Sequence, residues 1–236
     1  MTDETLSADD LAALTALDTP SVCNAIEIVV PERRAYGFTT STLQCVRPEF
    51  GSMVGHARTV TVRSTRPSEL DADAMRKIRF GYYDYVAEAA GPTISIVQDL
   101  DDGQAGFGAF WGEVNSNIHK SLGCLGTVTN GSVRDLDVLA EGFQAIAGVI
   151  APSHGFIHPV DFDCTVSIAG MVVQSHDLIH ADRHGAVVIP RGMARAVVEA
   201  AALIARREAV ILDAARAPGA TVETIKQSLI DSAKVT

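Results

Sequence analysis

The chain has 236 residues, of which 47% are hydrophobic and 20% are charged, a composition that suits a packed core and excludes disordered, collagen-like and coiled-coil chains. Its formal net charge of −10 opposes binding to nucleic acid or to an anionic membrane surface. The apolar runs are much shorter than the roughly 20 residues that span a bilayer, and residues 1–4 are polar and acidic, so we expect no signal peptide and no membrane segment.

Two helices are expected first, within residues 7–28. Ser7 begins a sequence similar to a capping box, leucines follow it at helical spacing, and Pro20 stands where a second helix would begin. The periodic pattern is lost over residues 31–52, which we expect to be a long connection.

The next part of the chain alternates strands with helices, as in a sheet with parallel strands. The expected strands are residues 55–63, 92–97, 125–129 and 145–150, and the expected helices are residues 71–90, 114–122 and 134–139. A glycine-rich loop, 103–108, precedes the second of these helices, and Asn130–Gly131 is expected to end the third strand as a turn.

After residue 152 the pattern changes to short strands separated by glycines and charged turns. These strands are expected at residues 164–168, 171–174, 178–180 and 186–189. Two helices, 193–215 and 222–233, follow them, and a charged trio at 206–208 is expected to interrupt the first. We therefore predict a single α/β domain, 1–236, whose mixed sandwich core at 55–190 has helices at both ends.

Several residue types argue against particular chemistries. The loop 103–108 has the order GxxGxG with no GK[ST] after it, which favours a sharply turning backbone over a phosphate site. All four lysines lie in polar helical settings, which disfavours a Schiff-base mechanism. The four cysteines are widely spaced without a CxxC pair, as expected for reduced thiols in a cytoplasmic protein.

The seven histidines include two sets with spacings of four residues, which would form a zinc-binding face only on a helix. The set at His176, His180 and His184 falls in expected strands and turns, where this spacing does not bring side chains together. We expect surface or hydrogen-bonding roles for these residues. His154 and His158, in a loop, are the histidines that could reach a substrate.

The strongest candidate site combines Glu113, at the start of a helix, with Arg134 and Asp135 after a strand. Open α/β sheets collect ligands where strands end and helices begin, because backbone N–H groups there lack partners and helix dipoles favour anions. A carboxylate could hold a hard divalent cation while the guanidinium binds a substrate carboxylate. The alternative is a surface Arg–Asp pair in which Asp135 only complements the helix dipole.

A family resemblance makes this site more specific. Glu113, twenty intervening residues and then Arg134–Asp135, inside the segment 123–135, resemble the acid-x20-Arg-Asp signature of the RraA-like family. Its enzymatic members include 4-hydroxy-4-methyl-2-oxoglutarate aldolase. Segments 17–25, 55–60 and 177–190 are similar to the family's opening, first strand and closing hairpin, so that the resemblance extends over residues 17–208.

The resemblance implies a swivelling β/β/α sandwich that assembles into trimers or hexamers with sites between subunits. It also implies a metal-dependent lyase that acts on a 2-oxo acid. The net charge and the short apolar runs argue against nucleic-acid and membrane partners. Aldol cleavage of 4-hydroxy-4-methyl-2-oxoglutarate and decarboxylation of oxaloacetate would both pass through a pyruvate enolate.

The resemblance also implies a role for each site residue. Asp135 would bind Mg²⁺ or Mn²⁺, Glu113 would hold a metal-bound water, and Arg134 would bind and polarise the pyruvate-like end of the substrate. Glu208 would be the acid contributed by a neighbouring chain. The backbone amides expected to receive the substrate carboxylate are those of Gly112, Val114 and Asn115.

The sequence departs from the family pattern at several places. Glu113 stands where the aldolases more often have Asp, and Ser175-His176-Asp177 replaces a usual Pro-Gly-Asp turn. The loop 154–159 and the connection 31–50 are peculiar to this chain. Two alternatives therefore stay open: a non-catalytic regulator that binds a ribonuclease, and a relative that acts on another 2-oxo acid.

Overall fold

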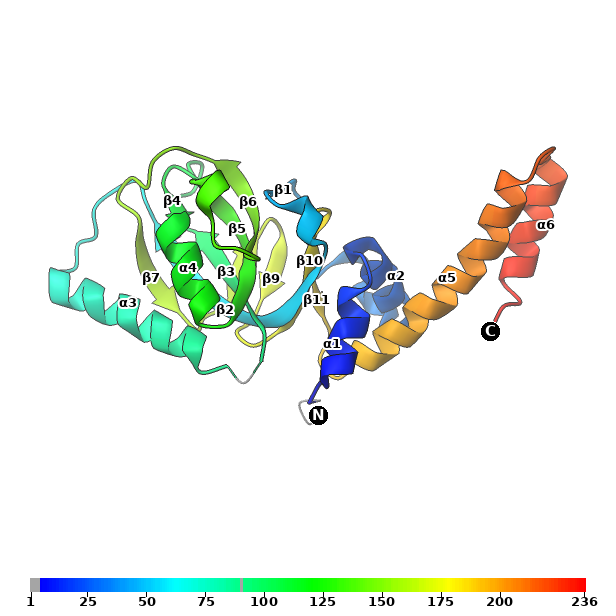
Figure 1. Ribbon diagram of the computed structural model, residues 1–236, viewed down its shortest axis with the longest axis horizontal. Coiled ribbons are helices and arrows are strands. Elements are labelled where there is room, and N and C mark those ends of the chain that lie inside the picture. The colour runs from blue at the N-terminus through cyan, green and yellow to red at the C-terminus, as the bar shows by residue number, and fades with distance from the viewer. Residues whose placement is uncertain (1–4, 90) are drawn as a thin grey trace.

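Within residues 5–89 and 91–236, the part of the chain that the computed structural model describes, nine strands form one mixed sheet (Figure 1). Its parallel strands are β2 (Met53–Arg63), β3 (Thr93–Asp99), β5 (Cys124–Val133) and β6 (Gln144–Ile150), with β4 (Ala109–Trp111) beside the end of β5. Antiparallel strands extend it: β1 (Gln44–Cys45) on β6, β7 (His158–Phe162) and β10 (Leu178–Asp182) on β2, and β11 (Gly185–Ile189) on β10.

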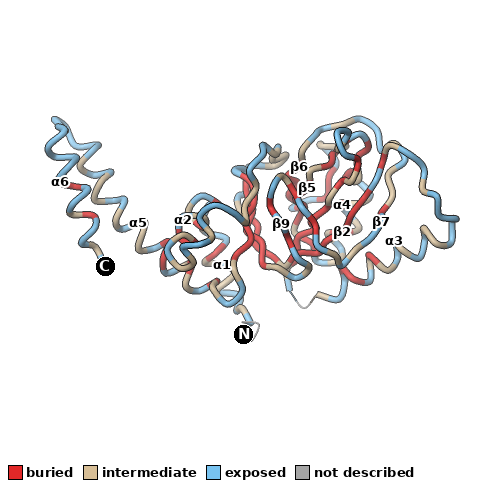
Figure 2. The backbone as a smooth tube through the Cα atoms, turned by 180° about the vertical axis from the view of Figure 1, so that it is seen from behind, coloured by how far each residue is buried: buried red, intermediate tan, exposed pale blue. Residues whose placement is uncertain are grey.

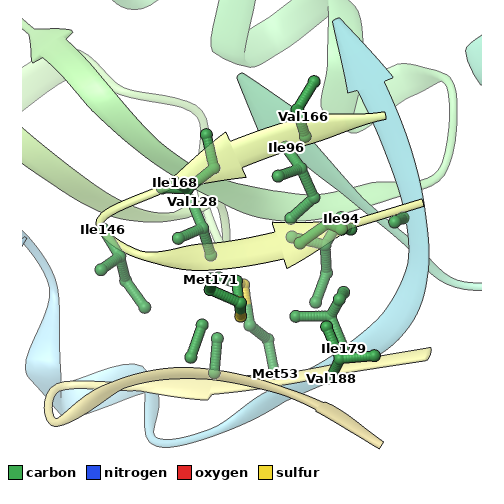
Figure 3. Close-up of a cluster of buried hydrophobic side chains, with 14 residues drawn as sticks. Met53, Ile94, Ile96, Val128, Ile146, Val166, Ile168, Met171, Ile179 and Val188 are labelled. Atoms are coloured by element: carbon green, nitrogen blue, oxygen red, sulfur yellow. The ribbon is translucent and has the colours of Figure 1, made fainter. Parts of the chain in front are cut away.

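Both faces of the sheet are covered. The hairpin of β8 (Val166–Ile168) and β9 (Met171–Val173) packs on one face (Figure 3). The helices α3 (Ala72–Ala87) and α4 (Glu113–Ser121) contribute to the second layer. Strand β3 is buried on both faces, except at the half-buried Gln98, because Ile96 faces the hairpin cluster while Val97 belongs to the opposite cluster. This is the β/β/α sandwich that the sequence predicted.

Terminal helices cover the β10–β11 end of the sheet. The helices α1 (Ala8–Thr15), α2 (Thr19–Val29) and α5 (Ala194–Arg216) bury a shared cluster with these strands. α6 (Val222–Ser232) packs on the outer half of α5, and the two helices project from the sheet with mostly exposed residues (Figures 1 and 2). No helix in the described ranges is long and apolar enough to cross a membrane.

The expected interruption of the helix at 206–208 is wrong, since α5 continues through it. Arg206 and Arg207 lie along the helix surface and donate hydrogen bonds to the carbonyl oxygens of Thr236 and Val235. Arg and Glu have high helix propensity, so the exposed charges end the apolar pattern and not the helix.

The connection 31–52 is more ordered than expected. It contains two 3-10 turns, Pro31–Ala35 and Pro48–Phe50, and the short strand β1, which pairs with β6. Arg47 fixes it to the domain by donating to the carbonyl oxygen of Leu136 at 2.9 Å. Long-range pairing, which leaves no local periodicity, orders this segment.

Other expected boundaries also change. The helix expected at 134–139 is a single 3-10 turn, Leu136–Val138, and β4 and β7 were not expected. The helix expected at 71–90 ends at Ala87, while Ala90 and residues 1–4 lie outside the described residues.

The expected turn at Asn130–Gly131 is also wrong, because β5 runs on to Val133. The register of β5 against β6 shifts between Thr129 and Ser132, so Asn130 and Gly131 lie in a bulge. The Asn130 side chain bridges to β3, accepting from the Asp99 N–H at 2.8 Å and donating to the Asp99 carbonyl oxygen at 3.0 Å. This extension carries the strand to the candidate site.

Candidate functional site

The candidate residues meet because two parallel strands end side by side. Trp111 at the end of β4 pairs with Val133 at the end of β5, and the Arg134 N–H donates to the Trp111 carbonyl oxygen at 2.9 Å. After β4 the backbone enters α4 through Gly112, and after β5 it turns at Asp135. The structure thus brings Glu113, Arg134 and Asp135 together.

Asp135 has a left-handed backbone, with φ 56° and ψ 42°. Its Oδ2 accepts a hydrogen bond from the Glu113 N–H at 3.3 Å and lies 3.6 Å from Arg134 Nε. The left-handed region is uncommon for residues other than glycine, although Asp tolerates it better than most. Such a conformation at a ligand-accessible position is a reason to suspect function. Here it places a carboxylate at the N-terminus of α4.

Gly112 permits this arrangement. A Cβ at position 112 would lie 2.6 Å from Asp135 Oδ2 and 3.2 Å from Arg134 Cγ. The φ of Gly112 is −167°, which any residue adopts. Glycine is therefore required here by the close approach of the carboxylate and not by the backbone conformation.

A hollow of about 180 Å³ opens beside these residues. Its lining includes all the expected substrate-binding positions, namely Gly112, Val114, Asn115 and Arg134, together with Glu113 and His154. The first-turn amides of α4 lack intrahelical partners by position, and the helix dipole adds partial positive charge there. Together with the guanidinium, they form a site suited to a carboxylate ligand.

The acidic side chains suit a hard cation. In the described part of the chain, no three His, Cys, Asp or Glu side chains come close enough to hold a metal ion by themselves. Magnesium is commonly held by one or two carboxylates, with water and substrate oxygens completing its shell. Asp135 with Glu113 is a donor set of this kind, and its oxygens fit Mg²⁺ or Mn²⁺ better than a softer metal.

A buried histidine that the sequence analysis missed supports α4 from behind. His119 Nδ1 donates to the Asn115 carbonyl oxygen at 2.7 Å, and its Nε2 accepts from the Tyr82 hydroxyl at 3.1 Å. Burial lowers the pKa of His119 to about 4, so the ring is neutral at pH 7. Trp111 packs against it edge to face at 4.7 Å. The sequence carries no local signal for it, because its burial depends on long-range contacts with Tyr82 and Trp111.

Other predicted residues lie elsewhere. Glu208 is exposed in the second half of α5 and does not line this hollow. Glu208 could therefore act only at the hollow of a neighbouring copy of the chain. His158 lines a separate hollow of about 550 Å³ with Arg63 and Arg66.

The histidines at 176, 180 and 184 have separate partners. His176 Nδ1 lies 2.6 Å from Arg58 Nη1, His180 Nδ1 lies 3.0 Å from Thr19 Oγ1, and His184 bonds to Asp182. They do not converge on one point.

The glycine loop turns its amides toward the protein. The Gly106 N–H donates to Asp99 Oδ2 at 2.7 Å, and the Gly108 N–H donates to Ser64 Oγ at 3.0 Å. These two amides bind groups of the same chain and not a phosphate, which agrees with the expected role of the glycines in turning the backbone.

Comparison with solved structures establishes the fold independently. An uncharacterized protein from Pseudomonas syringae pv. tomato str. DC3000 is similar with a TM-score of 0.72 and 20% identity over 97% of each chain. Streptomyces coelicolor RraAS2, described as an unusual member of the RNase ES inhibitor RraA protein family, has a TM-score of 0.68 and 20% identity, over 87% of this chain and 96% of its own. A structure described under novel cellulases from microbes associated with the gut ecosystem has a TM-score of 0.70 and 18% identity, over 88% of this chain and 89% of its own.

Sequence comparison assigns the family. No curated protein gives a significant match to the chain. The family model described as RraA-like, Aldolase/RraA, matches residues 19–188, a segment that contains Gly112, Glu113, Arg134 and Asp135 and excludes Glu208. Since this match covers most of the chain, the protein belongs to the RraA-like family.

Proposed function

We propose that the protein is a divalent-metal-dependent lyase that cleaves a carbon–carbon bond of a 2-oxo acid, either by aldol cleavage of the 4-hydroxy-4-methyl-2-oxoglutarate type or by oxaloacetate decarboxylation. The family includes lyases and ribonuclease inhibitors. The observation that favours a lyase is the meeting of Arg134 and Asp135 with the N-terminus of α4, beside a hollow that Arg134 and Glu113 line.

Substrate binding follows from the charges of the site. The 2-oxo acid carboxylate would accept hydrogen bonds from the first-turn amides of α4, between Gly112 and Asn115. The Arg134 guanidinium would then face the 2-oxo group. This orientation directs C3 and C4 away from the helix N-terminus.

Bond cleavage needs stabilisation of the charge that develops on the C2 oxygen. A divalent cation, held by Asp135 with Glu113 available to bind its water, would withdraw electrons from the 2-oxo group. Arg134 contributes a fixed positive charge at the same oxygen, so the electron pair released from the C3–C4 bond can be accommodated as an enolate. None of the described residues that line the hollow is a lysine, so the geometry favours this route over a Schiff base.

Two side chains at the hollow could move the protons. Aldol cleavage requires a base for the 4-hydroxyl proton, and both reactions require a proton at C3. Glu113 is one carrier, acting directly or through water. His154 is another, because its Nδ1 donates to the Gly155 carbonyl oxygen at 2.8 Å and leaves Nε2 as the acceptor.

The proposed site lies between subunits of an oligomer. The protein would act in the cytoplasm as a homotrimer or homohexamer with sites between subunits. Glu208, exposed on the projecting α5, would reach the hollow of a neighbouring copy and contribute an acid there.

The test is pyruvate release, coupled to lactate dehydrogenase, from oxaloacetate and from 4-hydroxy-4-methyl-2-oxoglutarate. Each is assayed with Mg²⁺, Mn²⁺ or EDTA, and the metal's own decarboxylation is subtracted. We expect metal-dependent release that falls at least about 100-fold in Asp135→Ala and in Arg134→Ala. Asp137→Ala removes an exposed carboxylate two residues away and should leave turnover unchanged.

Unchanged turnover in Asp135→Ala would contradict the metal assignment. No pyruvate from either substrate under any condition would reject these two activities. The ribonuclease-binding alternative could then be tested by pull-down.

A further inference from the structure

A second hollow adjoins the candidate site. It has a volume of about 240 Å³ and is lined largely by aromatic and aliphatic side chains of α3, β4, α4, the start of β7 and the residue before β7. Four of its lining residues, Phe110, Val114, Asn115 and Ile157, also line the hollow that contains Arg134. The two hollows are therefore neighbouring compartments that share a wall, one charged and one apolar.

We infer that the apolar hollow binds the C4 substituent of the substrate, which is therefore a 4-hydroxy-2-oxo acid with an aryl group on C4. The inference rests on the proposed function for the position of the 2-oxo acid end. Once that end lies at Arg134 and the start of α4, C4 is directed away from the helix N-terminus. The adjoining compartment offers an apolar surface to whatever C4 carries.

The size and lining of this compartment suit an aromatic ring. An apolar cavity of roughly 150 Å³ is enough to hold benzene, and this hollow has about 240 Å³. Tyr83, Phe110 and Ile118 supply its apolar surface, and Arg79 is the charged residue that lines it. The guanidinium of Arg79 would attract the face of an aromatic ring by a cation–π interaction, which an alkyl chain cannot make.

Hydrogen bonds hold the shared wall in place. Asn115 Nδ2 donates to the Phe110 carbonyl oxygen at 2.6 Å, and its Oδ1 accepts from the Tyr83 hydroxyl at 3.5 Å. Val114 occupies the first turn of α4 and is 70% exposed, an apolar side chain at the boundary of both compartments. A fixed wall with exposed apolar surface favours a ligand that covers it, because burial of that surface stabilises the complex.

The reaction balances without a further reactant. The C3–C4 bond breaks, the 4-hydroxyl gives its proton to a base, and C4 becomes the carbonyl carbon of an aryl aldehyde. C3 gains a proton, which completes pyruvate.

The first experiment measures binding to the unmodified protein by calorimetry in the presence of Mg²⁺. The ligands are pyruvate, 2-oxobutanoate, 2-oxopentanoate and 2-oxo-4-phenylbutanoate. We expect affinity to increase by up to about fourfold for each methylene that enters the apolar hollow, and the phenyl ligand to bind at least about tenfold more tightly than pyruvate. Cleavage of 4-hydroxy-2-oxo-4-phenylbutanoate should release pyruvate and benzaldehyde in equal amounts.

Two substitutions on α4 locate the effect. Ile118→Asp places a charge in the apolar hollow and should abolish the phenyl preference while pyruvate still binds. Asn117→Asp adds the same charge at an exposed neighbouring position outside both hollows and should retain that preference. If Ile118→Asp does not fold, Ile118→Ala should reduce the preference several-fold.

The outcomes separate the two proposals. Pyruvate binding that requires Arg134, with no gain from the phenyl group, would overturn this inference and leave the proposed function intact. Binding of no 2-oxo acid at all would overturn both. A phenyl preference that survives Ile118→Asp in a folded protein would place the ring elsewhere and also overturn the inference.

Discussion

Replacing Gly112 with alanine should disturb the site more than the fold. The added Cβ would lie 2.6 Å from Asp135 Oδ2, whereas ordinary contacts begin near 3.4 Å, so the carboxylate must move by about 0.8 Å. Asp135 is about one-third exposed and can yield, which places the overpacking cost near the low end of the usual range, at about 1 kcal/mol. The backbone of Gly112 adds no strain, because its φ of −167° is open to alanine. Displacement of a catalytic group by nearly 1 Å should lower turnover by roughly 100-fold.

Urea unfolding and metal-dependent pyruvate release should be measured on the same preparations. In an Asp135→Ala background the conflict with the carboxylate is gone and only the milder approach to Arg134 remains, so Gly112→Ala should cost at least about 0.5 kcal/mol less than in the unmodified chain. Gly91→Ala is the matched control, because nothing lies within 4 Å of its added Cβ. An equal cost of Gly112→Ala in both backgrounds would refute the claim that the carboxylate is what requires glycine there.

Two further predictions concern buried or strained histidines. Because burial lowers the pKa of His119 from 6.5 to about 4, the unfolded chain binds the extra proton between these values, and the free energy of unfolding should fall by about 3 kcal/mol as pH falls from 6.5 to 4. His119→Gln should flatten this pH dependence in urea titrations, and an unchanged slope would contradict the assignment. His176 has φ 69° and contacts the buried Arg58, so His176→Gly should relieve about 1 kcal/mol of strain but lose roughly 1–3 kcal/mol of pairing. In an Arg58→Met chain, which lacks the contact, His176→Gly should increase the free energy of unfolding. A decrease in both backgrounds would contradict the claim that backbone strain at position 176 opposes the contact with Arg58.

The layers of the fold could be predicted because local patterns agree with the global arrangement. Buried strands such as β3 are runs of β-branched residues, and α2 begins at Asp18, whose side chain accepts from the Ser21 N–H. The strands β4 and β7 could not be predicted. β4 has three residues, too few for periodicity, and β7 contains Pro159, which is tolerated there beside a register shift in β2. Only their long-range partners define them.

The site shows the same division between local and long-range information. The adjacency of Arg134 and Asp135 and their spacing from Glu113 could be read along the chain. The left-handed backbone of Asp135 and the need for glycine at position 112 could not, because both depend on how closely two segments approach. At the position where the family pattern has Gly, His176 has a left-handed backbone, and its ring contacts Arg58.

The helix α4 contacts Asp135, lines both hollows and carries the buried His119. Its N-terminus meets Asp135, its first turn forms the wall between the two hollows, and Ile118 lines the apolar one. His119 fixes the same helix through the Asn115 carbonyl oxygen. His119→Gln, measured at neutral pH, should therefore weaken pyruvate binding and the phenyl preference together, whereas Ile118→Asp should remove only the second. A His119→Gln protein that loses one and keeps the other would show that the two hollows do not depend on a common support.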